Sequence, residues 1–132
     1  MTKYKQLGFY FNQTECTGCK ACQIACKDKN ELPVGVIWRR VAEYSGGGWS
    51  QDTFEDTFTP NVFTYYTSVA CNHCDDPICV RVCPTQAMSK GEDGIVTVDA
   101  NTCIGCKYCA WACPYGAPQF NPDKGVMTKC NF

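Results

Sequence analysis

Cysteine is the residue type whose number and spacing indicate chemistry in this sequence. The 132-residue chain contains 13 cysteines, and all but one fall into three groups of four, which we call the first, second and third quartets. The first quartet is Cys16, Cys19, Cys22 and Cys26, the second is Cys71, Cys74, Cys79 and Cys83, the third is Cys103, Cys106, Cys109 and Cys113, and the remaining cysteine is Cys130. Closely spaced thiolates are ligands for soft metals and iron–sulfur clusters, so the sequence predicts that these cysteines are ligands.

A disulfide framework does not suit this pattern. The cysteine count is odd, and many of the cysteines lie too close together in sequence to pair. The first residues contain no apolar stretch and no twin arginine, so no export signal is visible. We therefore expect synthesis in a reducing cytosol, where disulfides do not persist.

The spacing within the quartets favours iron–sulfur clusters over zinc. In the first and third quartets, three cysteines are separated by two residues each and the fourth follows after three more, and prolines Pro84 and Pro114 follow the second and third quartets. This is the bacterial ferredoxin pattern for 4Fe–4S clusters. Zinc sites usually combine two Cys-x2-Cys units that a longer stretch separates, so a zinc-binding structural protein is the alternative that we favour less.

Short strands and helical turns must position these thiols. The spacing of three before the last cysteine of a quartet suits a helical turn, and we expect the fourth cysteine to begin a helix and to face away from the first three. Strands are predicted at 8–11, 62–69, 95–98 and 119–120, and a hairpin with a glycine turn at Gly46–Gly48 is predicted within 38–49. Arg39 and Arg40 are expected on an exposed strand edge. For His73, which lies between two cysteines, we expect a hydrogen bond to a cluster sulfur rather than ligation of iron.

Charge and composition exclude several classes of function. Twelve Lys and Arg against thirteen Asp and Glu give a net charge of −1, so nucleic-acid binding through a basic face is not expected. No stretch approaches the roughly 20 uncharged apolar residues of a membrane span. Neither a phosphate loop nor a catalytic triad is apparent, so we expect no catalysis by this protein. Its thin apolar content indicates that bound clusters stabilise the fold.

The sequence resembles the iron–sulfur electron-transfer subunit, the B subunit, of dimethyl sulfoxide reductase-type molybdoenzymes. The segments that carry the resemblance are 16–28, 44–49, 71–77, 103–109, 112–118 and 127–130. The resemblance implies an α+β fold of tandem bacterial ferredoxin-like 4Fe–4S modules with a β-hairpin insertion. It also implies three parts, which are an N-terminal cysteine motif at 1–30 that forms half of a module, the hairpin insertion at 31–68, and a dicluster module at 69–132.

The resemblance further implies which cysteines act together. In the family, the fourth cysteine of one quartet completes the cluster of another, which gives one site from Cys71, Cys74, Cys79 and Cys113 and a second from Cys103, Cys106, Cys109 and Cys83. Cys16, Cys19 and Cys22 would supply three ligands of a third cluster, and Cys26 and Cys130 two ligands of a fourth. Family members carry a fourth quartet, of which Cys130 would be the first ligand. We therefore expect the chain to be a fragment or a truncated product, with two complete cluster sites.

The function that the resemblance implies is electron transfer in anaerobic respiration. Electrons would pass from a membrane quinol-oxidising subunit, through the clusters, to a molybdopterin catalytic subunit. The expected partners are therefore the molybdopterin subunit and a membrane anchor subunit, and the expected location is the bacterial cytoplasmic membrane, reached through those partners. A free-standing polyferredoxin is the alternative within the same chemistry.

Overall fold

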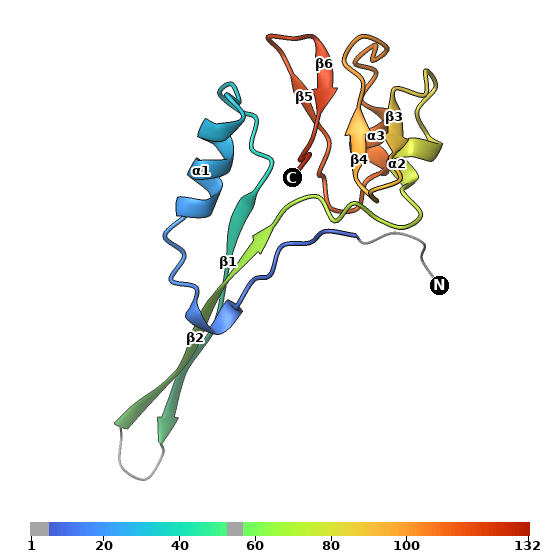
Figure 1. Ribbon diagram of the computed structural model, residues 1–132. Coiled ribbons are helices and arrows are strands. Elements are labelled where there is room, and N and C mark those ends of the chain that lie inside the picture. Colours follow the sequence, from blue (N-terminus) through green and yellow to red (C-terminus); the bar gives the residue numbers. More distant parts are fainter. Residues whose placement is uncertain (1–5, 53–56) are drawn as a thin grey trace.

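The computed structural model describes residues 6–52 and 57–132, and its helices and strands are short apart from one hairpin (Figure 1). The elements in chain order are a 3-10 turn η1 (Gln13–Glu15), α1 (Ala21–Lys29), β1 (Arg40–Asp52), β2 (Thr57–Val69), α2 (Ile78–Arg81), β3 (Met88–Lys90), β4 (Val96–Val98), α3 (Tyr108–Ala112), β5 (Gln119–Asn121) and β6 (Val126–Thr128). Each antiparallel sheet in these ranges has two strands, in the pairs β1–β2, β3–β4 and β5–β6. This mixed helix and strand content agrees with the expected α+β class.

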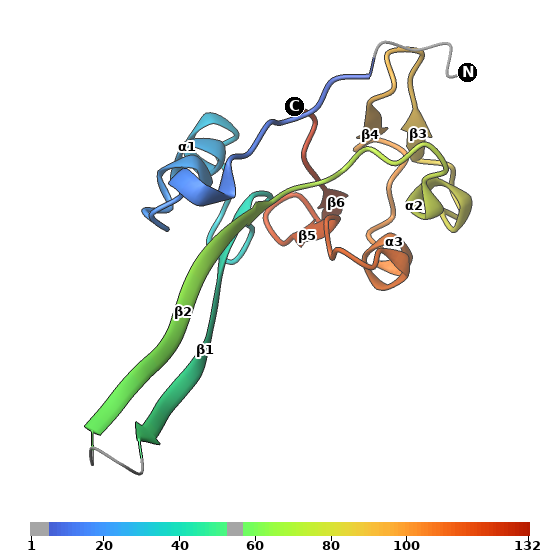
Figure 2. The ribbon, with the colours of Figure 1, turned by 90° about the horizontal axis from the view of Figure 1, so that it is seen from below.

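Strands β1 and β2 form an arm that projects away from the rest of the molecule in two perpendicular views (Figures 1 and 2). Their register runs from Arg40 opposite Val69 to Asp52 opposite Thr57. Strand β2 is rich in β-branched and aromatic residues, which favour extended backbone. On the arm, the exposed rings of Tyr44 and Tyr65 stack across the two strands, with their centroids 5.4 Å apart.

A hairpin is present, but the hairpin predicted within 38–49 and its glycine turn are wrong, because residues 40–52 form a single strand that pairs with 57–69. Gly46, Gly47 and Gly48 lie inside β1 and pair with residues of β2, and the connection between the strands falls at 53–56, outside the described residues. Gly47 has a φ of +93° and lies so close to the Asn61 carbonyl that a side chain there would clash. Glycine therefore serves here to permit a close approach of two strands and not a reversal of the chain.

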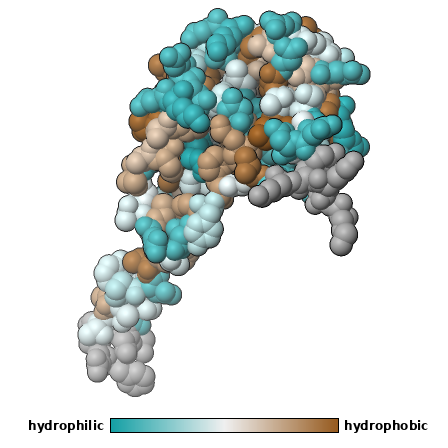
Figure 3. All heavy atoms as spheres, viewed as in Figure 1, coloured by the Kyte–Doolittle hydropathy of each residue, from teal (hydrophilic) through white to brown (hydrophobic). Residues whose placement is uncertain are grey.

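The second half of the chain gathers α2, α3 and the sheets β3–β4 and β5–β6, with β5–β6 between α1 and the other elements (Figures 1 and 2). The predicted strands at 62–69, 95–98 and 119–120 are confirmed as β2, β4 and β5, although β2 begins earlier, at Thr57. The buried residues at the centre of this half are Cys79, Met88, Val96, Cys109 and Met127. Polar residues cover most of the visible body, with apolar residues in small patches between them (Figure 3).

The strand predicted at 8–11 is wrong. Residues 6–12 form no helix or strand, and within the described ranges they pair with no sheet. Ring contacts hold this segment instead. Phe9 stacks on Phe132 with centroids 5.0 Å apart, and the Arg39 guanidinium lies 4.1 Å from the Phe9 ring centroid. The aromatic residues thus reflect packing here, and not the hydrogen bonding of a strand.

The helical turns follow the cysteine spacing, but the fourth cysteines lie elsewhere than predicted. Cys79 lies in α2 and Cys109 in α3, whereas Cys83 and Cys113 follow the ends of these helices. The prediction that a fourth cysteine begins a helix is therefore wrong. For Cys83 and Cys113 the reason is the proline that follows, because a residue before proline is driven out of helical conformation, and Cys113 is extended with φ −80° and ψ 117°. Cys26, which no proline follows, lies inside α1 and not at its start. None of the helices described is long and apolar enough to cross a membrane.

Candidate functional site

The three cysteine loops share a left-handed backbone position. Gly18 and Gly105 occupy the same position in the first and third quartets, with φ of +71° and +67°. Lys20 and Lys107 also correspond, with φ of +60° and +67°, and each immediately precedes a helix. In the second quartet the position of the glycine is taken by His73, whose φ is +46°. The internal repeat seen in the sequence is therefore a repeat of local geometry as well.

Thiols of the second and third quartets meet at a first cavity, which we call site A. Its volume is about 210 Å³, and the cysteines that line it are Cys71, Cys74, Cys79 and Cys113. Burial raises the pKa of the Cys79 thiol, and the nearby thiolates of Cys71 and Cys113 raise it further. The structure thus brings together the four cysteines that the family resemblance groups.

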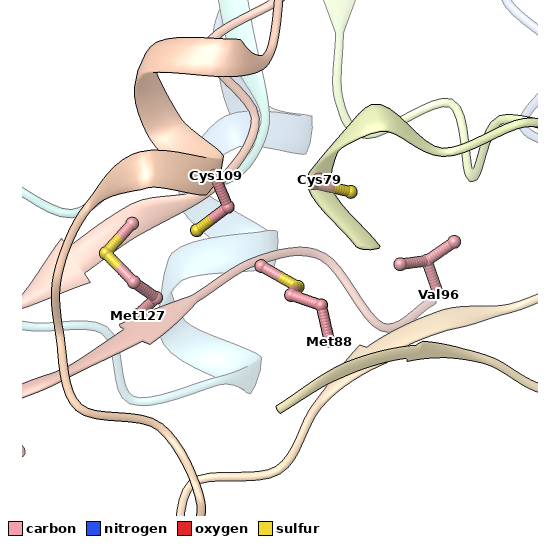
Figure 4. Packing of buried hydrophobic residues seen from close by; sticks show 5 residues of the cluster. All are labelled: Cys79, Met88, Val96, Cys109 and Met127. Atoms are coloured by element: carbon pink, nitrogen blue, oxygen red, sulfur yellow. The ribbon is translucent and has the colours of Figure 1, made fainter. Parts of the chain in front are cut away.

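A second cavity, site B, unites the other cysteines of the same two quartets. It is narrow, about 10 Å³, and its lining cysteines are Cys83, Cys103, Cys106 and Cys109. Met88 and Met127 also line it, and both pack in the buried centre with Cys109 (Figure 4). Burial is the largest cause that raises the pKa of Cys109 to about 11, followed by the charges of Cys103, Cys79 and Cys106.

The N-terminal cysteines are less completely gathered. Cys22, Cys26 and Cys130 line a cavity of about 420 Å³, which we call site C. Burial raises the pKa of Cys26, and the charge of Cys130 adds to this effect. Cys16 and Cys19 do not line site C, and Cys19 is exposed. The structure therefore brings Cys26 and Cys130 together as expected, but it also places Cys22 with them, whereas the expected grouping put Cys22 with Cys16 and Cys19.

Hydrogen-bond donors from the backbone point at several thiols. The N–H of His73 donates to Cys71 Sγ over 3.5 Å, and the N–H of Met127 donates to Cys103 Sγ over 3.4 Å. Burial would raise the pKa of Cys83, but hydrogen bonds from the Met88 N–H, then from the Thr85 side chain and further backbone N–H groups, outweigh burial and lower it. Donors of this kind stabilise a thiolate and hence the ligating form of cysteine.

Two buried side-chain nitrogens that lack a hydrogen-bond acceptor indicate whether an anionic group fits these sites. Among the side chains described, Arg39 Nη2 and His73 Nε2 are buried nitrogens with no hydrogen-bond partner. Arg39 lines site C and His73 lines site A. An unpaired buried donor costs about 1–3 kcal/mol, so each one calls for an acceptor in the same place. Sulfur-rich anionic clusters would supply that acceptor, and the residues present fit them. No three His, Cys, Asp or Glu side chains in the described ranges are spaced as ligands of a single metal ion.

Lys129 is a buried cation that sequence reasoning missed. It is 3% exposed, and its Nζ donates to the carbonyl oxygens of Val96 and Cys130. Burial lowers the pKa of Lys129, and the charges of Cys71, Cys130 and Cys79 oppose this effect. The ammonium group therefore lies near thiols of both site A and site C. Its only signal in the sequence is its place next to Cys130, because burial depends on packing between distant segments.

Arg39 also departs from the sequence expectation. It is half-buried rather than on an exposed edge, and its Nη1 donates to Ser68 Oγ over 3.1 Å. Arg40 is exposed as expected, and it donates to the Tyr115 carbonyl oxygen over 2.5 Å. The first residue of the hairpin thus contacts the loop after the third quartet, and the residue before the hairpin, Arg39, lines site C.

Comparison with known proteins agrees with this geometry. Residues 62–132 match the family described as 4Fe-4S dicluster domain. Over 126 residues the sequence is 56% identical to the probable anaerobic dimethyl sulfoxide reductase subunit YnfG of Escherichia coli K12, and the match covers 96% of this chain and 60% of that protein. Over 127 residues it is 53% identical to the B subunit of anaerobic dimethyl sulfoxide reductase from Haemophilus influenzae, and the match covers 96% of this chain and 62% of that protein.

More distant relatives carry related names. Over 137 residues the sequence is 38% identical to the formate dehydrogenase iron-sulfur subunit of Wolinella succinogenes, and the match covers 100% of this chain and 62% of that protein. The chain thus spans about 60% of the length of the curated relatives that it matches. With two four-thiol cavities in the segment that matches the family, the chain belongs to the 4Fe-4S dicluster domain family, together with the B subunits of anaerobic dimethyl sulfoxide reductases.

Proposed function

We propose that the chain is a non-catalytic electron-transfer subunit that carries electrons, by way of 4Fe–4S clusters, from a membrane quinol-oxidising subunit to a molybdopterin catalytic subunit. The observation that carries the proposal is the pair of four-thiol cavities, sites A and B. When bound, a 4Fe–4S cluster supplies one-electron redox chemistry that amino-acid side chains do not offer. The names of the relatives, the B subunits of dimethyl sulfoxide reductases above all, support the partners.

The ligands that we propose for sites A and B are the cysteines that line these two cavities. Cys71, Cys74, Cys79 and Cys113 hold the cluster of site A, and Cys83, Cys103, Cys106 and Cys109 hold that of site B. Cys16, Cys19 and Cys22 belong to a third cluster, and Cys26 and Cys130 belong to a fourth at site C, whose lining also includes Cys22. The thiols of site A surround a cavity of about 210 Å³, which suits a cluster of several atoms better than one tetrahedral zinc ion with sulfurs about 2.3 Å from it.

Other residues of the protein prepare these sites. Val96 lines site A and keeps water from the thiols, as do the methionines at site B. A cluster at site B requires Met88 and Met127 to give way, and methionine, with three rotatable bonds, adapts readily. Lys129 places a positive charge near the thiols of sites A and C, where anionic clusters need compensation.

We further propose that the N-terminal cysteine motif at 1–30, the hairpin insertion at 31–68 and the dicluster module at 69–132 are separate parts of this subunit. The exposed aromatic rings of the arm support a role of the insertion in docking to a partner subunit. Location at the bacterial cytoplasmic membrane follows from those partners.

Iron and acid-labile sulfide, measured per chain after anaerobic production with cluster-assembly machinery, test the proposal. About eight of each are expected from two complete four-thiol sites. Co-purification with a molybdenum-containing protein would distinguish a docked subunit from a free-standing polyferredoxin. Zinc without sulfide in the purified protein would contradict the proposal.

A further inference from the structure

His73 stands out among the cysteine loops because it holds a conformation that the other loops give to glycine. Its φ is +46°, whereas Gly18 and Gly105 have φ of +71° and +67° at the equivalent positions. A left-handed backbone costs a residue with a Cβ about 1–2 kcal/mol relative to glycine. His73 is also completely buried, with 0% of its surface exposed. Backbone strain at a buried polar side chain indicates a role for that side chain.

The hydrogen bonds of the ring define which nitrogen carries the proton. The N–H of Val96 donates to His73 Nδ1 over 2.9 Å, so Nδ1 is an acceptor. In a neutral imidazole the other nitrogen, Nε2, then carries the hydrogen. Within the described residues Nε2 is buried and has no partner. The ring thus holds one buried N–H group that needs an acceptor.

The surroundings fix this ring beside the thiols of site A. His73 lines site A with Cys71, Cys74 and two further cysteines. Phe132 stacks on the imidazole, with centroids 4.4 Å apart, and Gln6 Nε2 donates to the His73 carbonyl oxygen over 2.7 Å. Ring and backbone are therefore both restrained, and the imidazole is held in place before any ligand arrives.

We propose that the Nε2–H group of His73 donates a hydrogen bond to a sulfur atom of the cluster in site A and thereby raises the midpoint potential of that cluster. The inference rests on the proposed function and adds to it a residue that tunes one site and not the other. A donor to sulfur favours the reduced state, because reduction adds negative charge that the N–H dipole stabilises. Sites B and C have no histidine, since His73 is the only one in the sequence.

The sequence itself offers the variant for the test. His73→Gly removes the donor and installs the residue that the first and third quartets already use at this position. Midpoint potentials of both clusters are measured by redox titration monitored by paramagnetic resonance. At the wild-type midpoint potential, we expect the ratio of reduced to oxidised cluster in site A to fall about tenfold, which corresponds to about 59 mV. The ratio in site B should change less than about twofold.

A second measurement uses the unaltered protein. With histidine ¹⁵N-labelled only at Nε2 of the ring, which leaves the backbone nitrogen that donates to Cys71 Sγ unlabelled, we expect a ¹⁵N coupling to one reduced cluster in double-resonance spectra. This coupling is observable even if His73→Gly fails to keep its cluster. Absence of that coupling, equal potentials in the wild type and His73→Gly, or equal shifts at both sites would each overturn the inference. A wild-type protein that takes up no iron and sulfide would overturn the proposed function first, so the two failures are distinguishable.

Discussion

Cys83 shares a cavity with Cys103 and not with Cys79, although Cys79 lies only four residues before it in the sequence. Cys79 lies in α2 and faces site A, and Cys83 follows the helix and faces site B. Pro84 ends the helical conformation at this point, so the backbone turns its next thiol toward the other cavity. Cys113, which precedes Pro114, behaves in the same way. It belongs to the third quartet in sequence, but it lines site A with cysteines of the second quartet.

This crossing predicts the effect of removing single ligands. Cys83→Ser should damage the cluster of site B and leave that of site A nearly intact, because serine oxygen is a harder and poorer ligand for this iron. We expect conversion of the site B cluster to a 3Fe–4S form or a large shift of its potential. Paramagnetic resonance of Cys83→Ser and Cys113→Ser shows which signal each variant alters.

A Cys74→Ser variant serves as the control for site A. If Cys83→Ser alters only the signal that Cys74→Ser also alters, then the fourth cysteine acts within its own quartet. That result would contradict the ligand sets proposed for both sites.

The loop of the third quartet should tolerate no side chain at Gly105. A Cβ there would lie 2.6 Å from the Gly125 carbonyl oxygen and 3.0 Å from the Phe120 ring, and φ is +67°. Gly105→Ala should therefore lower the iron content by loss of the site B cluster. Gly125→Ala is the matched control, because its φ is +66° but a Cβ would meet nothing within 4 Å. Equal iron loss in both variants would mean that backbone strain, and not the clash of the added Cβ, causes the loss of the cluster.

Replacement of Lys129 should destabilise the protein. Lys129→Met leaves the carbonyl oxygens of Val96 and Cys130 without their donor, which costs about 1–3 kcal/mol of unfolding free energy. Lys124→Met removes the same charge from an exposed position and should change stability by less than about 0.5 kcal/mol. Chemical unfolding of the cluster-loaded protein measures both values. A stability of Lys129→Met equal to that of the wild type would rule out this role.

Asp99 should support the turn that leads into the third quartet, and this support should depend on pH. The Thr102 hydroxyl, at 2.6 Å, is the main cause that lowers the pKa of Asp99, and the Asn101 N–H adds to it. A lowered pKa stabilises the folded state above the ordinary value of 3.8, and this contribution is lost as the pH falls through the lowered value. Asp99→Ala should thus unfold at a lower temperature than the wild type at neutral pH, and Glu92→Ala, exposed nearby, should not.

The cysteine chemistry could be predicted from the sequence because it depends on local spacing. The spacing of the cysteines and the following prolines indicated the loops and helical turns around Cys79 and Cys109, and β-branched runs indicated β2 and β4. Features that depend on tertiary contacts escaped prediction. The glycines at Gly46–Gly48 indicate conformational freedom, which serves a turn and a close strand pair equally well.

The burial of Arg39 and Lys129 escaped prediction for the same reason. Both side chains lie against segments far away in sequence, Arg39 beside Phe9 and Lys129 beside Val96. Long charged side chains are exposed in most proteins, so only the assembled fold reveals these two.

The order of the cysteines in the sequence also determines when the thiol sets of sites A and B are complete during synthesis of the protein. As the ribosome adds residues in order, the thiol set of site B is complete at Cys109 and that of site A only at Cys113. Until then the second-quartet thiols emerge as an unfinished set in the nascent protein. With the proposed ligand sets, neither the cluster of site A nor that of site B can be complete before the third quartet is translated. Each of these clusters would link the second quartet to the third, so its formation would depend on the whole segment 71–113 and not on a single motif.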